Sequence, residues 1–225
     1  MSWISRLMGS NEINIDMVSF DTFDWPELSR GKQQIIWRSE SQPAQLSINY
    51  FHRTPDLPRK IHQPNALPDY FRKKVLQQNG GLIKVASTRL DFLPAIETIF
   101  KIPMPTKGLI YVGSYTIPFS HDSFVVKVQA QEYFDIGGRE KMMEEKLRAQ
   151  NQLQLNEQGG VMNWKTDPYD PDQTLGMLMN QSEKEQYDLF FAEHPLSVVR
   201  ASMYRIAQSI RFDEKLRELE PYSVS

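Results

Sequence analysis

The sequence has no cysteine among its 225 residues. That absence excludes disulfide bonds, thiolate zinc sites, iron–sulfur ligation by cysteine and a cysteine nucleophile. Long apolar runs are missing too, because no stretch approaches the roughly 20 apolar residues that a membrane-spanning helix requires. The N-terminus also lacks the apolar run and cleavage site of a signal peptide. We therefore expect a cytoplasmic protein without a membrane span.

An excess of charge of one sign is also lacking. The chain has 26 Lys and Arg against 28 Asp and Glu, for a formal net charge of -2. Such a balance gives no basic field that would gather nucleic acid, so no nucleic-acid partner is expected. The 40% hydrophobic and 11% aromatic content predicts a packed core. We expect a single domain over residues 1–225, with a peripheral amphipathic turn at 1–12 and a peripheral, fraying tail at 213–225.

Local signatures of common catalytic and cofactor sites do not occur in the sequence. The patterns G-x-S-x-G, G-x-x-x-x-G-K-[ST], G-x-G-x-x-G and H-E-x-x-H are all absent. The chain therefore lacks local evidence for a nucleophile elbow, a phosphate loop, a dinucleotide turn or a zinc helix. We expect no cofactor and no metal site, and the sequence favours a protein that is not an enzyme without excluding one.

Period-two alternation of β-branched and aromatic residues predicts a sheet. In "QLSINYF", for example, Leu46, Ile48 and Tyr50 share one face of a strand. The expected strands lie at 13–23, 33–39, 45–51, 82–90, 95–104, 108–119 and 123–133. Short connections between the last four indicate an antiparallel meander, and apolar residues on both faces indicate covering layers on both sides. The predicted fold class is α+β, with about seven mainly antiparallel strands packed against helices.

Helices are expected at 68–81, 137–160, 182–191 and 192–212. In the last of these, gaps of three and four residues place five apolar side chains on one stripe, namely Leu196, Val199, Met203, Ile206 and Ile210. We expect that stripe to face the core. Ser182 and Glu185 have the spacing of a capping box, and His194 could cap the helix that Pro195 begins.

The connection at 161–181 is the first candidate binding site. Trp164 and Tyr169 are flanked there by Asp167 and Asp170, a composition that protein interfaces favour. The prolines of "DPYDPD" do not fit a calcium-binding loop. A loop with these aromatics could equally fold back on its own domain, and the sequence leaves both readings open.

Arg139 follows a glycine pair and could hold an anion at a helix N-terminus, or simply begin the helix. An alternative catalytic reading takes a general base from His52, Asp56 or His194, with Arg139 as the anion contact of a hydrolase. That reading predicts a pocket in which at least two of these residues converge. A third reading, a small-molecule binder, predicts an apolar cleft between sheet and helices.

The stretches "GLIYVGSYTIPFSHDSFVVKVQAQEYFDIGGREKMM" and "SEKEQYDLFFAEHPLSVVR" resemble a set of uncharacterised bacterial proteins over the second two-thirds of the chain. No activity is assigned to that set, so the resemblance implies no catalytic residue. The strand–helix order is also loosely similar to the Mog1/PsbP/DcrB type of α/β/α sandwich, whose members mostly bind other proteins. We therefore expect a non-enzymatic protein-interaction or accessory module, such as an operon-linked protective partner or adaptor of another protein, of undetermined oligomeric state.

Overall fold

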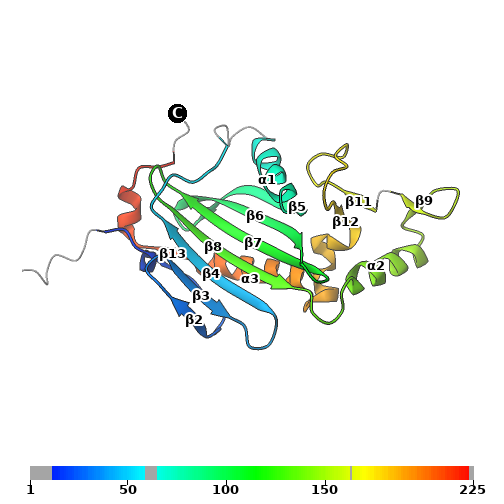
Figure 1. The fold of residues 1–225 in the computed structure, drawn as a ribbon, viewed down its shortest axis with the longest axis horizontal. Helices are drawn as coiled ribbons and strands as arrows, with labels where there is room; N and C mark the ends of the chain where they lie inside the picture. The colour runs from blue at the N-terminus through cyan, green and yellow to red at the C-terminus, as the bar shows by residue number, and fades with distance from the viewer. Residues whose placement is uncertain (1–11, 59–64, 163, 223–225) are drawn as a thin grey trace, which may run out of the picture.

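A seven-stranded antiparallel sheet forms the centre of the computed structural model, which describes residues 12–58, 65–162 and 164–222 (Figure 1). Its strands are β2 (Glu27–Arg30), β3 (Gln34–Arg38), β4 (Ala44–Phe51), β5 (Gly81–Leu90), β6 (Leu93–Pro103), β7 (Leu109–Pro118) and β8 (Ser123–Gln131). They are ordered β2-β3-β4-β8-β7-β6-β5. The predicted α+β class and seven-stranded sheet are confirmed.

One edge of the sheet differs from the prediction. The stretch 13–23 is not a sheet strand, because it forms a short 3-10 helix, η2 (Ile15–Met17), and the two-residue strand β1 (Val18–Ser19). The edge position belongs instead to β2, all four of whose residues are exposed. A strand with no buried face shows no apolar alternation, so its sequence resembles a turn.

Helix α3 (Pro195–Ser209) covers one face of the sheet across β7 and β8 and lies behind the sheet in Figure 1. The predicted stripe is confirmed, because its five apolar side chains are essentially inaccessible to solvent. The helix comes so close to β7 that a Cβ on Gly113 would lie 2.7 Å from Val199 Cγ1 and 2.8 Å from Met203 Cγ. Only glycine allows this approach without displacing the helix.

Helix α1 (Ala66–Leu76) packs on the opposite face, over β5 and β6. Residues three apart on a strand point to opposite faces, and accordingly Ile99 joins the α3 core whereas Ile96 joins the α1 cluster. The predicted helix at 68–81 therefore exists but ends earlier than expected. Asn79 adopts the expected left-handed conformation, with φ of 54°.

Beyond β8 the chain leaves the sheet and forms α2 (Gly138–Ala149), which extends away from it in Figure 1. The predicted helix over 137–160 is too long. Its second half is a hairpin of β9 (Gln154–Leu155) and β10 (Val161–Met162). Asn151, which follows the C-cap residue Gln150, takes a positive φ of 53°. A right-handed helix cannot include a residue in this left-handed conformation, so α2 ends before it.

The segment after the hairpin is held by β11 (Lys165–Thr166), which pairs with β12 (Met179–Asn180). Two 3-10 helices follow, η3 (Gln181–Glu183) and η4 (Glu185–Phe191), in place of the predicted helix at 182–191. The predicted capping box of Ser182 and Glu185 is wrong. The capping box consists of Asn180 and Glu183, two residues earlier.

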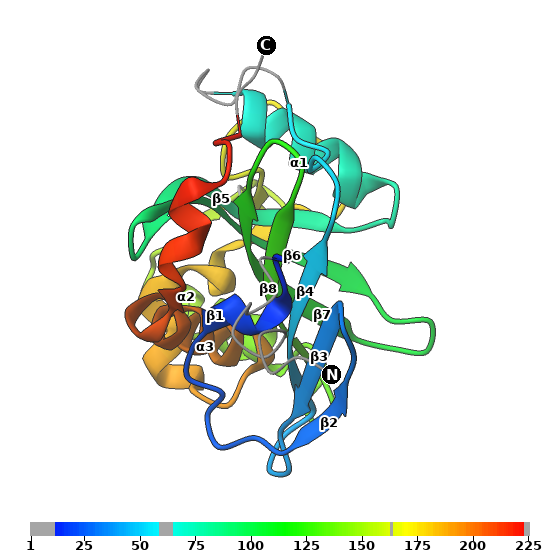
Figure 2. The same cartoon turned by 90° about the vertical axis from the view of Figure 1, so that its left-hand side faces the viewer.

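A short strand near each end of the described chain lies beside the sheet, and the two strands pair (Figure 2). Strand β1 pairs with β13 (Arg211–Phe212), and the 3-10 helix η5 (Glu214–Glu218) follows. Leu216 of η5 is fully buried, so this part of the tail packs against the core. Residues 1–11 of the expected amphipathic turn lie outside the described residues.

Candidate functional site

The aromatic and acidic loop at 161–181 turns its polar atoms inward. The indole N–H of Trp164 donates to Glu140 Oε1 at 2.8 Å. The hydroxyl of Tyr169 accepts from Val85 N at 2.6 Å and donates to Val85 O at 2.9 Å, so this side chain satisfies one residue of the edge strand β5. Of the two readings left open by the sequence, these contacts support a loop that folds back on its domain.

The two carboxylates of the loop also bond within the chain. Asp167 is buried and accepts two hydrogen bonds from Arg72, at 2.8 and 2.9 Å. It also accepts the backbone N–H groups of Tyr169 and Asp170. The side chain of Asp170 accepts the N–H of Asp172 at 3.2 Å. Burial raises the pKa of Asp167, but the bonds from Arg72 and the backbone outweigh burial, and the pKa is lowered.

Arg139 is buried where α2 meets η3, η4 and α3. Its Nε donates to Ser182 O at 2.8 Å, its Nη1 to Ser197 Oγ at 2.9 Å and its Nη2 to Asp188 Oδ1 at 2.9 Å. Nη2 also donates a hydrogen bond to Lys184 O at 3.4 Å. Burial lowers the pKa of Arg139, although Asp188 acts in the opposite direction. The anion that this guanidinium holds is therefore Asp188 of the same chain.

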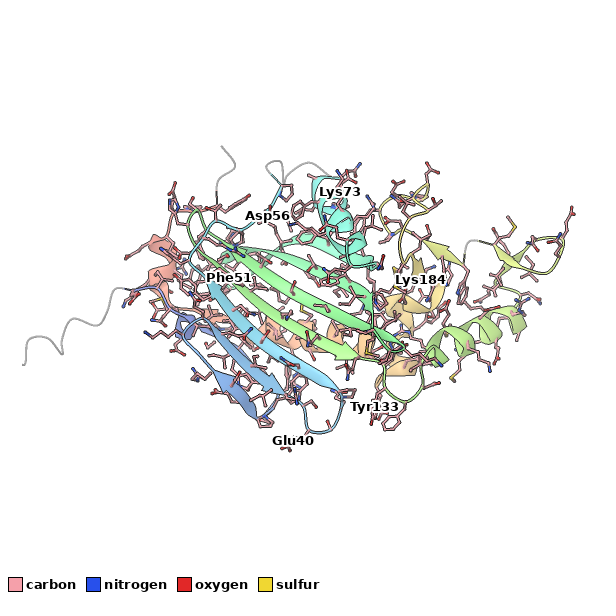
Figure 3. All side chains as sticks on the ribbon, viewed as in Figure 1. Glu40, Phe51, Asp56, Lys73, Tyr133 and Lys184 are labelled. Carbon is pink, nitrogen blue, oxygen red and sulfur yellow. The ribbon has the colours of Figure 1, made fainter. Side chains whose placement is uncertain are left out.

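The candidate general bases lie at opposite ends of the sheet. His52 Nδ1 lies 2.8 Å from Asp122 Oδ1, and Lys74 Nζ lies 2.5 Å from Asp56 Oδ2. Figure 3 places Asp56 and Tyr133 at the two ends of the strands, and His194 belongs to the Tyr133 end because both residues line one pocket. The structure therefore brings His194 and Arg139 together and separates them from His52 and Asp56.

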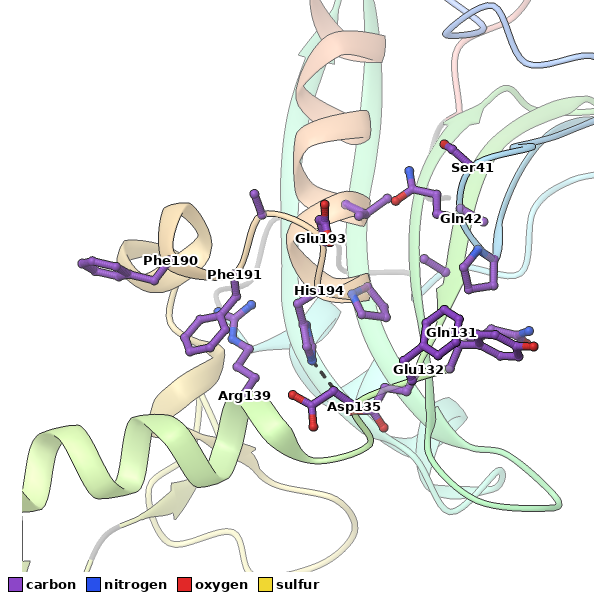
Figure 4. A pocket seen from close by; sticks show the side chains of 18 of the residues that line it. Ser41, Gln42, Gln131, Glu132, Asp135, Arg139, Phe190, Phe191, Glu193 and His194 are labelled. Atoms are coloured by element: carbon purple, nitrogen blue, oxygen red, sulfur yellow. Dashed lines mark ion pairs between the residues drawn. The ribbon is translucent and has the colours of Figure 1, made fainter.

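A pocket of about 750 Å³ opens at this end of the sheet (Figure 4). Its walls come from three distant segments: 41–44 in the β3–β4 turn, 130–135 at the end of β8, and 189–195 between η4 and α3. Glu132, Arg139 and His194 line this pocket and also a second cavity of about 380 Å³ beside it. We refer to the 750 Å³ cavity as the β8-end pocket.

Glu132 and His194 form the polar floor of the β8-end pocket. Glu132 accepts the N–H groups of Leu109 at 2.9 Å and Gly137 at 3.3 Å, and His194 Nε2 lies 3.7 Å from its Oε1. Burial raises the pKa of Glu132, but His194 and the two N–H groups prevail, so the pKa is lowered and the carboxylate is charged. His194 Nδ1 accepts Leu196 N at 3.2 Å, which confirms the predicted helix cap.

A buried polar cluster lies next to this floor. Lys101 Nζ donates to Glu183 Oε2 at 2.7 Å and to Leu178 O at 3.0 Å. The hydroxyl of Tyr111 donates to Glu183 Oε1 at 3.1 Å, and the Tyr111 ring contacts His194 edge to face at 5.3 Å between centroids. Burial raises the pKa of Tyr111 well above its ordinary value. These bonds fix η3 to the sheet and so hold one wall of the second cavity.

The rim of the β8-end pocket carries four large exposed hydrophobic side chains. The exposed fractions are 64% for Tyr133, 92% for Phe134, 94% for Leu189 and 65% for Phe190. The rings of Tyr133 and Phe134 meet edge to face, with centroids 4.4 Å apart. Lys146 Nζ lies 3.8 Å from the centroid of the Phe190 ring. Exposed apolar side chains gathered around one hollow mark an interaction surface.

These four rim residues were not among the candidates from the sequence, because the sequence predicts a strand over 123–133 and a helix over 182–191. One signal was available in "YDLFF". Leu189, Phe190 and Phe191 are consecutive, and a single helical turn cannot direct three adjacent side chains to the same buried face. The convergence of this segment with Tyr133 and Phe134 has no signal in the sequence, because the two are more than fifty positions apart.

Within the described ranges, no group of three or more His, Cys, Asp or Glu residues could hold a metal ion. The same part of the chain contains no helix that is long and apolar enough to cross a membrane. What the site provides is a hollow with a satisfied polar floor and an exposed apolar rim.

Comparison with known proteins adds little to this description. No protein-family model matches the chain, and no curated protein matches it. Solved structures that match include a crystal structure from Bacteroides thetaiotaomicron, with a TM-score of 0.35 and 9% sequence identity. The match covers 52% of this chain and 39% of that chain, so this chain spans well under two thirds of the other protein. A likeness of this size carries no argument, and the resemblances to uncharacterised bacterial proteins and to the Mog1/PsbP/DcrB type stay hypotheses.

Proposed function

We propose that this chain is a non-enzymatic protein-binding module that takes a segment of a partner protein into the β8-end pocket. The observation that carries the proposal is the gathering of Tyr133, Phe134, Leu189 and Phe190, all exposed, around that pocket. Exposed aromatic and aliphatic side chains around a hollow are the anchors that dominate binding energy at protein interfaces. Their exposure is costly in water, and covering them supplies the driving force.

The polar groups of the pocket favour binding over hydrolysis. His194 uses Nδ1 as the cap of α3 and directs Nε2 toward Glu132, so both ring nitrogens face groups of the chain. The guanidinium of Arg139 is bonded to Asp188 and to main-chain oxygens. A general base and an anion contact must reach the substrate, whereas every nitrogen of Arg139 already donates within the chain and His194 Nε2 lies 3.7 Å from Glu132 Oε1.

The pocket is also a better candidate interface than the 161–181 loop. Trp164, Asp167 and Tyr169 are each bonded to another element of the same chain, and a partner that used them would have to break those bonds first. Leu189 and Phe134 have more than nine tenths of their surface free. Binding there needs no rearrangement of the domain.

A double variant tests the proposal. Leu189→Ser with Phe190→Ser removes half of the exposed rim, and Leu28→Ser with Tyr204→Ser removes a comparable exposed area from β2 and the outer face of α3. Each purified protein is immobilised, and proteins recovered from a lysate of the source cells are quantified by mass spectrometry. The partner should bind the wild type and the Leu28/Tyr204 control equally.

The amount of partner recovered on the Leu189/Phe190 variant should fall by about tenfold or more, because each truncated anchor of this size contributes about 1 to 2 kcal/mol to the binding free energy. The recovered partner is then purified and its affinity for the three proteins measured by calorimetry. Equal affinity for all three would remove the pocket as the binding site.

A further inference from the structure

We infer that the segment taken by the β8-end pocket is basic as well as apolar, and that an Arg or Lys side chain of the partner pairs with a rim carboxylate, Asp135 or Glu193. This inference rests on the function proposed above and names the chemistry of the partner. It follows from the charges around the pocket and from the groups that already neutralise some of them.

Among the described residues that line the pocket, three carry carboxylates and two carry basic groups. The acids are Glu132, Asp135 and Glu193, and the bases are Arg139 and His194. Arg139 is already bonded to Asp188, a carboxylate that it shares with Arg200, and Glu132 is already satisfied by two backbone N–H groups and faces His194. Among the described charged groups that line the pocket, the two rim carboxylates are therefore the ones without a partner in the chain.

Asp135 and Glu193 are both exposed on the pocket rim. Within the part of the chain that the structure describes, neither side chain makes an ion pair or a hydrogen bond. They come from different walls of the pocket, one from the end of β8 and one from the segment before α3 (Figure 4).

Charge complementarity then selects the occupant. A purely apolar segment would strip water from two carboxylates without replacing it, which is unfavourable. An acidic segment would meet like charges. A segment with a basic side chain supplies the missing counter-charge, while its apolar neighbours cover Leu189 and Phe134.

The aromatic rim suits the same chemistry. The Tyr133 and Phe134 rings adjoin Asp135 directly in the chain, and a guanidinium can stack on an aromatic face while it bonds to a carboxylate. The rim already shows this type of contact, because Lys146 lies over the Phe190 ring at 3.8 Å. Arg and Lys both fit, and the planar guanidinium uses ring and carboxylate together.

The test is selection of short linear peptides from a random display library on the immobilised wild-type chain. Selected sequences are compared with the unselected library for their Arg and Lys content. One selected peptide is then synthesised in two forms, with its basic residues intact and with each Arg replaced by citrulline or each Lys by norleucine. Affinities are measured by calorimetry at low and at high salt.

Three variants accompany the wild type. Asp135→Asn with Glu193→Gln removes the two rim charges and keeps their shape. Glu157→Gln with Asp172→Asn removes two exposed acids that do not line the pocket, and serves as the matched control. Leu189→Ser with Phe190→Ser removes the apolar rim. All of these positions are exposed, so the fold is expected to remain, and circular dichroism checks it.

The expected result is enrichment of Arg or Lys, with affinity about fivefold weaker for the Asp135/Glu193 variant and for the neutral peptide, and unchanged for the control. High salt should weaken wild-type binding. Apolar peptides that lose affinity only with the Leu189/Phe190 variant would overturn this inference and leave the proposed function standing. Failure to select any peptide that prefers the wild type over the Leu189/Phe190 variant would overturn both.

Discussion

Arg72 and Asp167 face each other through two nearly parallel hydrogen bonds, from Nε to Oδ2 at 2.9 Å and from Nη2 to Oδ1 at 2.8 Å. Both residues are buried, and they lie 95 positions apart in the chain. This bidentate pair fixes the 161–181 loop against α1. The third nitrogen of Arg72 bonds to Asp69 on the same helix, so the guanidinium has a carboxylate partner on each side.

Replacement of Asp167 by Ala should therefore destabilise the protein strongly. The change leaves a buried guanidinium without its main counter-charge, which costs about 3 to 5 kcal/mol of the free energy of unfolding. Urea denaturation followed by circular dichroism measures it. Asp172→Ala, in the same loop but exposed, is the matched control and should change stability by less than about 0.5 kcal/mol. Similar stabilities for the two variants would show that the pair does not hold the loop.

Acid should destabilise the protein through Asp167 and Glu132. Both carboxylates have pKa values lowered in the folded state, so each contributes stability that is fully present above its unfolded pKa of about 4. That contribution is lost as the pH falls through the lowered folded value. The urea midpoint should stay nearly constant from about pH 7 to about pH 5 and then fall.

Asp167→Asn supplies the comparison for the acid titration. This variant lacks one of the two titrations, so its stability should be lower near neutral pH and should fall less steeply with acid than that of the wild type. Parallel curves for the two proteins below about pH 4.5 would mean that Asp167 does not contribute to the acid response.

The sequence predicted the elements whose one face is buried along their whole length. Leu46, Ile48 and Tyr50 alternate because β4 buries one face in the main core, and the spacing in α3 arises because that helix buries its apolar stripe in the same core. Strand β2 was missed because both its faces are exposed and no apolar pattern is required of it. The helix at 137–160 was predicted too long because Asn151, a turn-forming residue at its true end, is also tolerated in helices.

The candidate site could be predicted far less well than the fold. Its walls contain segments near Gln42, Tyr133 and Phe190, and their convergence depends on how β4 pairs with β8 and where α3 begins. A single sequence contains no signal for contacts at such separations. Arg139 and His194 were predicted as individual residues of interest, and the structure places both on the pocket, where their bonds hold its walls.

Gly113 tests the contact between α3 and the sheet. A methyl group at this position would lie well inside contact distance of Val199 and Met203, so Gly113→Ala should lower the free energy of unfolding by about 1 to 3 kcal/mol. The matching experiment is a double-mutant cycle with Met203→Ala, which makes room for the added carbon. The double variant should be more stable than the sum of the two single changes implies, by about 1 kcal/mol. Strict additivity would contradict the contact.

Arg139 should not tolerate lysine. An ammonium group cannot reproduce the fork that reaches Ser182 O, Ser197 Oγ and Asp188 together, so Arg139→Lys should cost about 2 kcal/mol of stability. Lys141→Arg, an exposed position on the same helix, is the reciprocal control and should be neutral. Because Arg139 ties α2 to η4 and α3 beside the pocket, the lysine variant should also bind the partner more weakly at a temperature at which it remains folded. A stable variant with full affinity would exclude this role.

Substitutions of His194 can distinguish its two roles, which are to cap α3 and to face Glu132. Asparagine is an effective N-cap but too short to face Glu132, whereas alanine can do neither. If capping is the main contribution, His194→Asn should stay within a few tenths of a kcal/mol of the wild type and His194→Ala should lose about 1 kcal/mol, measured by thermal and urea unfolding. Equal losses for both variants would assign the contribution to Glu132 instead. The carboxylate keeps its bonds from Leu109 and Gly137 in either variant, so we expect the first outcome.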